Sequence, residues 1–190
     1  MGKITNQNKG AIGEYIVLSR LLLLGYDAAK ANFTVNNVNG YDIFCRNNDT
    51  GMIKTIQVKT TTEGVFHVGM SHAPFFNSED KVDMMQGRRF VESKIDSSWI
   101  FVDVLGTDLH PDFRFFILSR KQIIDLILAS EEWYLTGYQR NRPLSKNGNI
   151  LIPCSWLEGK GVTASSKHVE FVNPLASAQL EDEWNNIWKD

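Results

Sequence analysis

The chain has 190 residues, of which 43% are hydrophobic and 22% charged, and its formal net charge is −2. These values are typical of a globular protein with a full-sized core, exclude an intrinsically disordered chain, and give no overall charge argument for nucleic-acid binding. The longest apolar run, Leu21 to Leu24, is far too short for a membrane span, and residues 1–6 lack the apolar core of a signal peptide. We therefore expect a cytoplasmic protein with no membrane partner.

The cysteine content and the uniform composition indicate the role of the thiols and the number of domains. Only Cys45 and Cys154 occur, so we expect two reduced, structural thiols and no cysteine-based metal site. No internal repeat, low-complexity tract or linker divides the sequence. We therefore expect a single domain over residues 1–190.

The first predicted element is a helix over residues 6–24. Apolar residues recur at helical spacing, and Gly25 can end the helix in the left-handed conformation. Glu14 lies in the first half of the helix, and spacing alone leaves open whether its side chain faces water or the sheet. Gly10 and Gly13 each lower helix propensity by roughly 1 kcal/mol relative to alanine, a cost that fits a place where another group approaches the backbone closely.

The most informative stretch is a predicted β-hairpin. Its two strands, 43–45 and 53–59, are joined by a polar turn rich in asparagine, aspartate and glycine. Because side chains alternate along a strand, Gln57 and Lys59 share one face. The hairpin therefore places Asp42, which precedes the first strand, beside this Gln/Lys pair.

The remaining elements alternate between strands and helices. Residues 65–68 are expected to pair back on the hairpin, and the apolar run 99–105 indicates a strand buried on both faces. Asn173, followed by proline, predicts the start of a closing helix with Trp184 and Trp188 on its apolar face. The other expected elements are a strand at 26–31, a helix at 83–95, a strand at 113–118 and a helix that begins with a Ser119/Gln122 capping box. This order predicts an α+β fold, with a mixed central β-sheet flanked by helices.

Asp42, Gln57 and Lys59 on adjacent strands, with Glu14 from a helix, are the groups that metal-dependent phosphodiester hydrolysis requires. Mg²⁺ prefers hard oxygen ligands and keeps several waters, so one or two carboxylates and a substrate phosphate oxygen suffice to bind it. A bound metal lowers the pKa of a water and offsets charge on the pentacovalent phosphate, and a lysine can orient the nucleophile or balance that charge. Gln57 would serve as a neutral ligand through its amide oxygen.

The pattern resembles the PD-(D/E)XK nuclease superfamily, in particular the branch that includes archaeal Holliday junction resolvases and some homing and restriction-type endonucleases. The resemblance covers the first third of the chain and rests on four stretches in order: residues 10–14, 25–26, 40–43 and 57–60. It implies a restriction-endonuclease-like core of α-β-β-β-α-β order that cleaves DNA with Mg²⁺ or Mn²⁺. It also implies Glu14 and Asp42 as metal ligands and Lys59 as the catalytic lysine, while Gln57 is expected as a metal ligand from the chemistry of its amide oxygen. Residues 1–130 would form the catalytic core, and residues 131–190 a C-terminal extension packed on it.

Two departures from the superfamily pattern bear on activity. No proline precedes Asp42, and Gln57 stands where the pattern has an acid, which removes one negative charge from the metal site. Three interpretations therefore stay open. One is an active endonuclease in which Glu14 supplies the second carboxylate. Another is a degenerate module that binds nucleic acid or a protein partner without cleaving it. The third is an unrelated globular fold in which these motifs match by chance.

Several further residues are candidates for contact with DNA. His67 and His72 could touch a scissile phosphate and Glu63 could add a carboxylate, although surface, core and turn roles explain these residues more simply. A homodimer would provide one active site for each strand of a duplex, and Trp184 and Trp188 are candidates for the core or for its interface. A solvated surface is the simpler explanation for each of the basic residues that could neutralise phosphates, which are Arg88, Arg89, Lys94, Arg140, Arg142 and Lys146.

Overall fold

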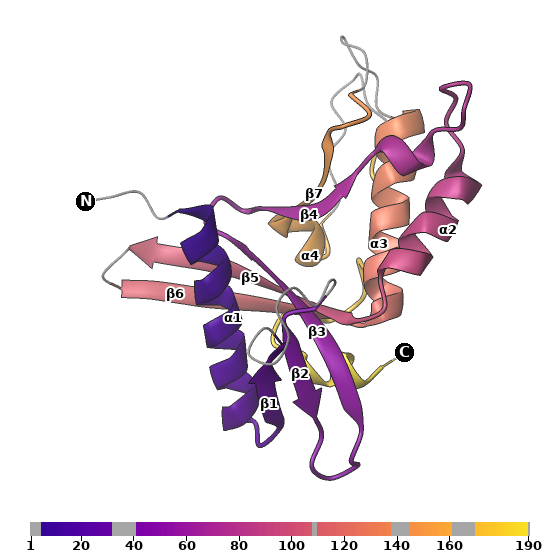
Figure 1. Cartoon of the computed structure of the whole chain (residues 1–190). Coiled ribbons are helices and arrows are strands. Elements are labelled where there is room, and N and C mark those ends of the chain that lie inside the picture. The colour runs from indigo at the N-terminus through magenta and orange to yellow at the C-terminus, as the bar shows by residue number, and fades with distance from the viewer. Residues whose placement is uncertain (1–4, 32–40, 108–109, 138–144, 161–169, 190) are drawn as a thin grey trace.

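The computed structural model describes residues 5–31, 41–107, 110–137, 145–160 and 170–189 (Figure 1). Short 3₁₀ helices are labelled η2 and η4, and η3 is a π-helical turn. The elements in chain order are α1 (Asn6–Leu23), β1 (Asp27–Lys30), β2 (Ile43–Arg46), β3 (Ile53–Thr61), β4 (Val65–Ser71), η2 (Ala73–Phe75), α2 (Met84–Lys94), β5 (Ser98–Thr107), β6 (His110–Leu118), α3 (Arg120–Glu132), η3 (Trp133–Gly137), β7 (Asn149–Pro153), α4 (Cys154–Leu157) and η4 (Trp184–Trp188).

Five strands form the central sheet in the order β1-β2-β3-β5-β6. Neighbouring strands are antiparallel except for β3 and β5, which run parallel. Parallel neighbours need a long crossover, and α2 lies in the connection between these two strands. The expected α+β fold with a mixed sheet flanked by helices is confirmed (Figure 1). The elements α1, β1, β2, β3, α2 and β5 follow one another in the α-β-β-β-α-β order, with β4 placed between β3 and α2.

The position of β4 corrects one expected strand pairing. Residues 65–68 do form a strand, but β4 pairs with β7 in a separate two-stranded ribbon and not with the hairpin. Both edges of β3 are already occupied, by β2 and by β5, so β4 has no edge of β3 to join. Gly64, at a φ of 70°, takes the left-handed conformation where the chain leaves the sheet.

The sheet separates two hydrophobic clusters. On one face, α1 and η4 cover a cluster that includes Val17, Ile56 and Ile100. On the other face, α2, α3 and the ribbon of β4 and β7 cover a cluster that includes Phe101 and Ile127. Successive residues of β5 belong to opposite clusters, which confirms that this strand is buried on both faces.

The C-terminal segment corrects the expected closing helix. The Leu175 amide donates to Asn173 Oδ1 at 2.9 Å, and Asn173 Nδ2 donates to the Trp156 carbonyl at 2.7 Å. Asn173 therefore holds a local turn instead of starting a helix, and the helical part of the described segment 170–189 is the short η4. Trp184 packs on Phe115 with ring centroids 5.4 Å apart, so it is a core residue.

Both cysteines are free, buried thiols. Burial raises the pKa of Cys45 and of Cys154 to about 12, which suppresses thiolate reactivity and fits the expected structural role.

Within the described ranges, no helix has the length and apolar character needed to cross a membrane.

Candidate active site

The hairpin of β2 and β3 positions the candidate site. The two strands pair with Ile43 opposite Ile56, and the side chain of Asn47 accepts hydrogen bonds from two backbone amides of the connecting turn. Side chains alternate along β3 as predicted. Ile56 and Val58 are buried in the core under α1, whereas Gln57 and Lys59, on the opposite face of the strand, are half-buried. The hairpin therefore turns a row of polar side chains away from α1.

Asp42 occupies the position where β2 begins. Its Oδ2 atom accepts a hydrogen bond from the Val58 amide at 2.8 Å and another from Gln57 Nε2. The Asp42 amide in turn donates to the Ile56 carbonyl at 2.8 Å. Asp42 Oδ1 accepts no hydrogen bond from the described residues, so this oxygen can serve a ligand.

The electrostatics of Asp42 identify the groups around it. Burial raises the pKa of the Asp42 carboxyl, and the nearby Glu14 carboxylate raises it further. The hydrogen bond from Val58 and the positive charges of Lys59 and Lys30 lower it. Each of the other three residues expected at the site is thus within hydrogen-bonding or electrostatic reach of Asp42.

Lys59 lies on the same face of β3 as Gln57. Its Nζ atom is 5.3 Å from the ring centroid of Trp99 on β5. The same Nζ atom would lie 3.5 Å from a Cβ atom added at Gly69 of β4. Burial lowers the pKa of Lys59, and the Asp42 carboxylate raises it. The lysine is therefore partly desolvated between the sheet and β4.

Glu14 is held against the sheet by a close approach of α1 to β3. Gly13 is buried, and a Cβ atom there would clash with Thr60 Oγ1, so glycine is what lets the helix reach the strand. Glu14 Oε2 forms an ion pair at 2.6 Å with Lys30 Nζ, and both side chains are mostly buried. Gly10, by contrast, has no atom within 4 Å of an added Cβ, so close approach explains only one of the two glycines.

Lys30 is a residue at this site that the sequence interpretation missed. It lies on β1, on the same strand face as half-buried Ala28, while Asp27 and Ala29 are exposed. A lysine on the inward face of a short strand requires a nearby carboxylate, because an unpaired buried charge is costly. The sequence of β1, with two adjacent alanines, does not alternate, so no pattern in the sequence indicated that Lys30 faces inward.

The donor atoms present fit a hard divalent cation. Asp42, Glu14 and the amide oxygen of Gln57 are the oxygen ligands that Mg²⁺ and Mn²⁺ accept. The described residues contain no cluster of three histidine, cysteine, aspartate or glutamate side chains, so the Gln57 amide would be the third protein ligand beside the two carboxylates. Gln57 now directs Nε2 to Asp42, and a half-turn of the amide would present its oxygen instead.

The described basic candidates for contact with DNA lie on α2 and in the segment that precedes β7. Arg88, Arg89 and Lys94 are exposed along α2, where the first pairs with Glu92 at 3.4 Å. Lys146 pairs with Asp80. Arg140 and Arg142 lie outside the described residues.

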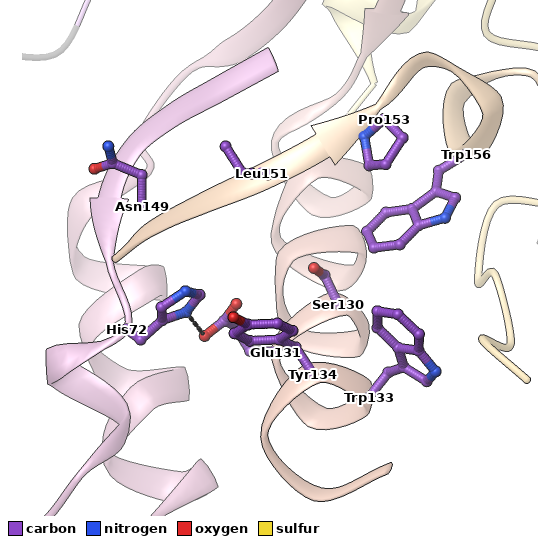
Figure 2. A pocket seen from close by; sticks show the side chains of 9 residues that line it. All are labelled: His72, Ser130, Glu131, Trp133, Tyr134, Asn149, Leu151, Pro153 and Trp156. Atoms are coloured by element: carbon purple, nitrogen blue, oxygen red, sulfur yellow. Dashed lines mark hydrogen bonds and ion pairs between the residues drawn. The ribbon is translucent and has the colours of Figure 1, made fainter. Parts of the chain in front are cut away.

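The structure gives no described contact between the candidates Glu63, His67 and His72 and Asp42. Glu63 pairs with Lys9 at 3.6 Å, and His67 is exposed on β4. His72 is buried, with Nδ1 2.7 Å from Glu131 Oε2 on α3, so it belongs to a different hollow of the molecule (Figure 2).

Comparison with known proteins adds little to this geometry. No protein-family model and no curated protein matches the sequence. Among solved structures the chain aligns with a bacterial homing endonuclease, I-Ssp6803I, at 15% sequence identity and a TM-score of 0.34. The alignment covers 62% of this chain and 66% of that chain, just under two thirds of the endonuclease's length. A likeness at this TM-score does not establish a shared function.

Proposed function

We propose that this protein is a DNA endonuclease of the PD-(D/E)XK type that hydrolyses phosphodiester bonds with Mg²⁺ or Mn²⁺. The observation that carries the proposal is the environment of Asp42. A mostly buried carboxylate receives Gln57 and a strand amide on one oxygen and has Glu14 and Lys59 within electrostatic reach. Perturbed carboxylates and lysines brought together in this way are typical of catalytic sites.

Asp42, Glu14 and the amide oxygen of Gln57 would hold the cation. When bound, a divalent cation lowers the pKa of a water and offsets charge on the phosphate. Asp42 Oδ1 is the oxygen directed to this task, since Oδ2 is occupied by Val58 and Gln57.

Lys59 would balance the negative charge that develops on the phosphate. A partly desolvated ammonium interacts more strongly with an anion than a hydrated one, because less water screens it. Trp99 lies beside the ammonium group and limits its freedom. The lowered pKa of Lys59 also brings the group closer to the range in which a lysine can exchange a proton.

The basic residues of α2 would contribute binding without sequence specificity. Arg88, Arg89 and Lys94 are exposed cations on one helix, and each phosphate that they neutralise would add to the salt dependence of DNA binding. A homodimer that presents two sites to a duplex is part of the same proposal.

A second candidate function is a binding module that has lost the chemistry. The observation that favours it is the ion pair of Glu14 with Lys30, which already neutralises one of the two carboxylates at the site. Gln57 adds no negative charge, and Lys30 offsets the charge of Glu14. The negative charge available to a cation is therefore lower than the two carboxylates of Glu14 and Asp42 would provide.

Cleavage of supercoiled plasmid and of branched DNA, in Mg²⁺, Mn²⁺ or EDTA, separates the two functions. We expect metal-dependent nicking that Asp42→Asn and Lys59→Met both reduce by about 100-fold or more. The matched controls are Asp49→Asn, a turn carboxylate of the same hairpin, and Lys121→Met, an exposed lysine of α3. Nicking that survives both site variants would refute the site, and tight DNA binding without any cleavage would establish the binding module.

A further inference from the structure

A hollow lies between α3, η3 and β7, lined by residues other than those of the candidate active site (Figure 2). Its volume is about 270 Å³, and much of its wall is aromatic, with Trp133 and Tyr134 from η3 and Trp156 from α4. This volume is just below the roughly 300–1,000 Å³ of pockets for drug-sized ligands. The hollow therefore suits one small ring system.

A buried acid–imidazole pair lies at one end of the hollow. His72 is 5% exposed and Glu131 is 1% exposed, and His72 Nδ1 lies 2.7 Å from Glu131 Oε2. The imidazole also stacks on Tyr134, with ring centroids 4.8 Å apart and an interplanar angle of 28° (Figure 2). Of the polar side-chain atoms that line the hollow, Trp156 Nε1 is buried with no hydrogen-bond partner among the described residues. A buried donor without a partner is costly, and an acceptor on a ligand would offset that cost.

The π-helical turn η3 sets the shape of the aromatic wall. It continues α3 directly, from Trp133 to Gly137. A π turn widens the helix and shifts the side chains that follow, and such turns occur frequently at functional sites. Here the rings of Trp133 and Tyr134 from this turn line the same hollow as Ser130 from the preceding α3.

The lining selects the chemistry of the ligand. The nine described lining residues include no lysine or arginine, so the hollow does not suit a phosphate or a carboxylate. Aromatic rings favour a flat group that stacks, and the oxygens of Glu131 and Ser130 favour a group that donates N–H hydrogen bonds. A nucleobase with an exocyclic amino group has both properties.

The hollow is connected to the candidate active site by β4. Gly69 of β4 lies beside Lys59, and His72 follows three residues later. Three residues of chain span at most about 10 Å, the length of roughly three stacked nucleotides at 3.4 Å each, and the irregularity of β4 near Gly69 shortens this span. A base in the hollow would thus belong to a strand that also reaches Lys59.

We propose that this hollow binds an unpaired nucleobase that carries an exocyclic amino group, supplied by a free nucleoside or by an extrahelical base of a strand. Base binding rests on the hollow alone, and its link to strand cleavage rests on the proposed nuclease function. Glu131 accepts the amino group, and Tyr134 and Trp156 flank the ring.

The test follows the intrinsic tryptophan fluorescence of the full chain in EDTA, since Trp133 and Trp156 line the hollow. Adenosine and cytidine are expected to quench it in a saturable manner and to bind about tenfold more tightly than uridine, which has no exocyclic amine. Calorimetry gives the affinities independently of fluorescence. Equal binding of uridine would overturn the amine assignment, and no saturable binding of any nucleoside or of octadeoxyadenylate at millimolar concentration would overturn the proposal.

Two tryptophan variants locate the binding. Leu151→Trp fills the hollow from β7 and is expected to weaken adenosine binding about tenfold or more. Leu105→Trp adds the same side chain on β5, outside the hollow, and should leave binding unchanged. Both positions are partly exposed, 42% and 40%, so both variants should fold, which circular dichroism checks. Equal binding by the two variants would overturn the assignment to this hollow.

The source of the base and the link to cleavage need separate measurements. Octadeoxyadenylate that binds more tightly than adenosine, and loses that advantage in Leu151→Trp, identifies a strand; equal affinity identifies a free nucleoside. Nucleoside binding without plasmid nicking in Mg²⁺ would support the hollow and refute the nuclease. Nicking without nucleoside binding would support the nuclease and refute the hollow.

Discussion

The Nζ atom of Lys30 lies 2.6 Å from Oε2 of Glu14, and only 12% and 19% of the two side chains is exposed. The same ammonium group lies 4.3 Å from the centroid of the Tyr15 ring. The positive charge of Lys30 also lowers the pKa of Asp42, so it acts on both carboxylates of the candidate site. The ammonium group of Lys30 therefore lies where the proposed function requires a divalent metal ion.

We expect Lys30→Met to tighten Mn²⁺ binding about three- to tenfold, because it removes a positive charge that competes for Glu14. In the absence of metal the same variant should be less stable by about 1 kcal/mol, since Glu14 loses its partner. Isothermal titration calorimetry measures the first effect and urea unfolding the second. Lys121→Met, at an exposed lysine of α3, is the control. Weaker Mn²⁺ binding by Lys30→Met would show that Lys30 supports the metal site instead of competing for it.

Gly13 and Gly10 provide a matched pair in one helix. A Cβ atom at position 13 would clash with Thr60 Oγ1 and lie 3.0 Å from Thr60 Cβ, whereas one at position 10 meets no atom within 4 Å. We expect Gly13→Ala to cost about 1–3 kcal/mol of stability and Gly10→Ala to add up to about 1 kcal/mol. Chemical denaturation measures both, and a Thr60→Ala background should recover part of the first loss.

The same pair tests the placement of Glu14. Because Gly13→Ala pushes α1 away from β3, it should also reduce metal-dependent nicking, whereas Gly10→Ala should not. Equal stability of the two variants would mean that α1 does not approach the strand as closely as described.

Asp42→Asn should make the protein more stable at neutral pH. Burial raises the folded-state pKa of Asp42 above the ordinary value of 3.8, so the folded protein holds this proton more tightly than the unfolded chain does. Stability from this group is therefore full below the unfolded-state pKa and is lost as the pH rises through the folded-state pKa. Asparagine is neutral at every pH and avoids that loss.

Urea unfolding of the two proteins over a pH series measures the effect of Asp42→Asn. The advantage of the variant should shrink as the pH falls toward 3.8, the ordinary aspartate pKa. Lys59→Met should also stabilise the protein at neutral pH, because the lowered pKa of Lys59 reports a cost of burying its charge that is relieved only as the pH rises through that pKa. A loss of stability in Asp42→Asn at pH 7 would show that the surrounding lysines outweigh burial.

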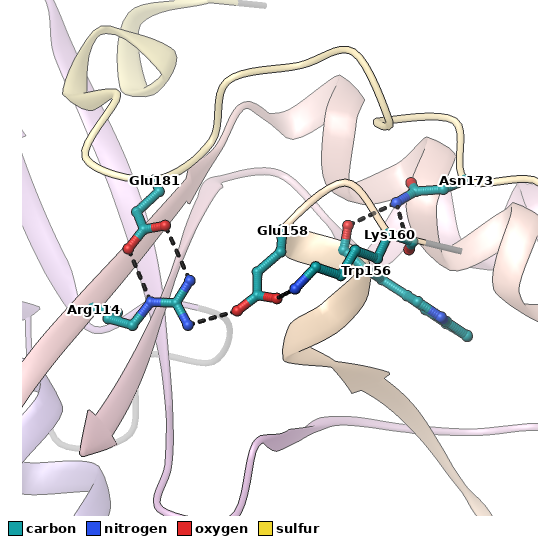
Figure 3. Close-up of polar contacts among 6 residues, drawn as sticks. All are labelled: Arg114, Trp156, Glu158, Lys160, Asn173 and Glu181. Atoms are coloured by element: carbon teal, nitrogen blue, oxygen red, sulfur yellow. Dashed lines mark hydrogen bonds and ion pairs between the residues drawn. The ribbon is translucent and has the colours of Figure 1, made fainter. Parts of the chain in front are cut away.

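Arg114 joins two C-terminal segments to β6 (Figure 3). Its Nε and Nη2 atoms lie 2.9 and 3.0 Å from the two carboxylate oxygens of Glu181, and Nη1 lies 2.6 Å from Glu158. We expect Arg114→Met to cost roughly 1–2 kcal/mol, because the bidentate pairing is well formed but partly exposed to solvent. Arg88→Met, which breaks an exposed pair within α2, should cost less than about 0.5 kcal/mol.

The contribution of Arg114 should also depend on pH. Hydrogen bonding by Lys160, and then by Arg114, lowers the pKa of Glu158, and the Arg114 hydrogen bond lowers that of Glu181. Stability from these carboxylates is present above their ordinary pKa and is lost as the pH falls through the lowered values. The difference between wild type and Arg114→Met should therefore narrow in acid, and a difference that stays constant with pH would contradict this account.

Local patterns in the sequence predicted much of this molecule. The capping box of Ser119 and Gln122 is present as predicted, and Gly25 ends α1 at a φ of 85°. The hairpin register placed Asp42 beside Gln57, because strand alternation and turn chemistry act over a few residues. The expectation for 65–68 gave the right element but the wrong partner, since pairing depends on which sheet edges distant strands have already occupied.

The sequence by itself determined the α+β class, the hairpin and the residue types at the candidate site, because those follow from periodicity, turns and side-chain chemistry over short stretches. Only the tertiary structure decided that Lys30 neutralises Glu14, that Asn173 forms a turn against Trp156, and that His72 pairs with Glu131. These contacts join residues 16, 17 and 59 positions apart. Their partners are selected by how the helices and strands pack, which no local pattern encodes.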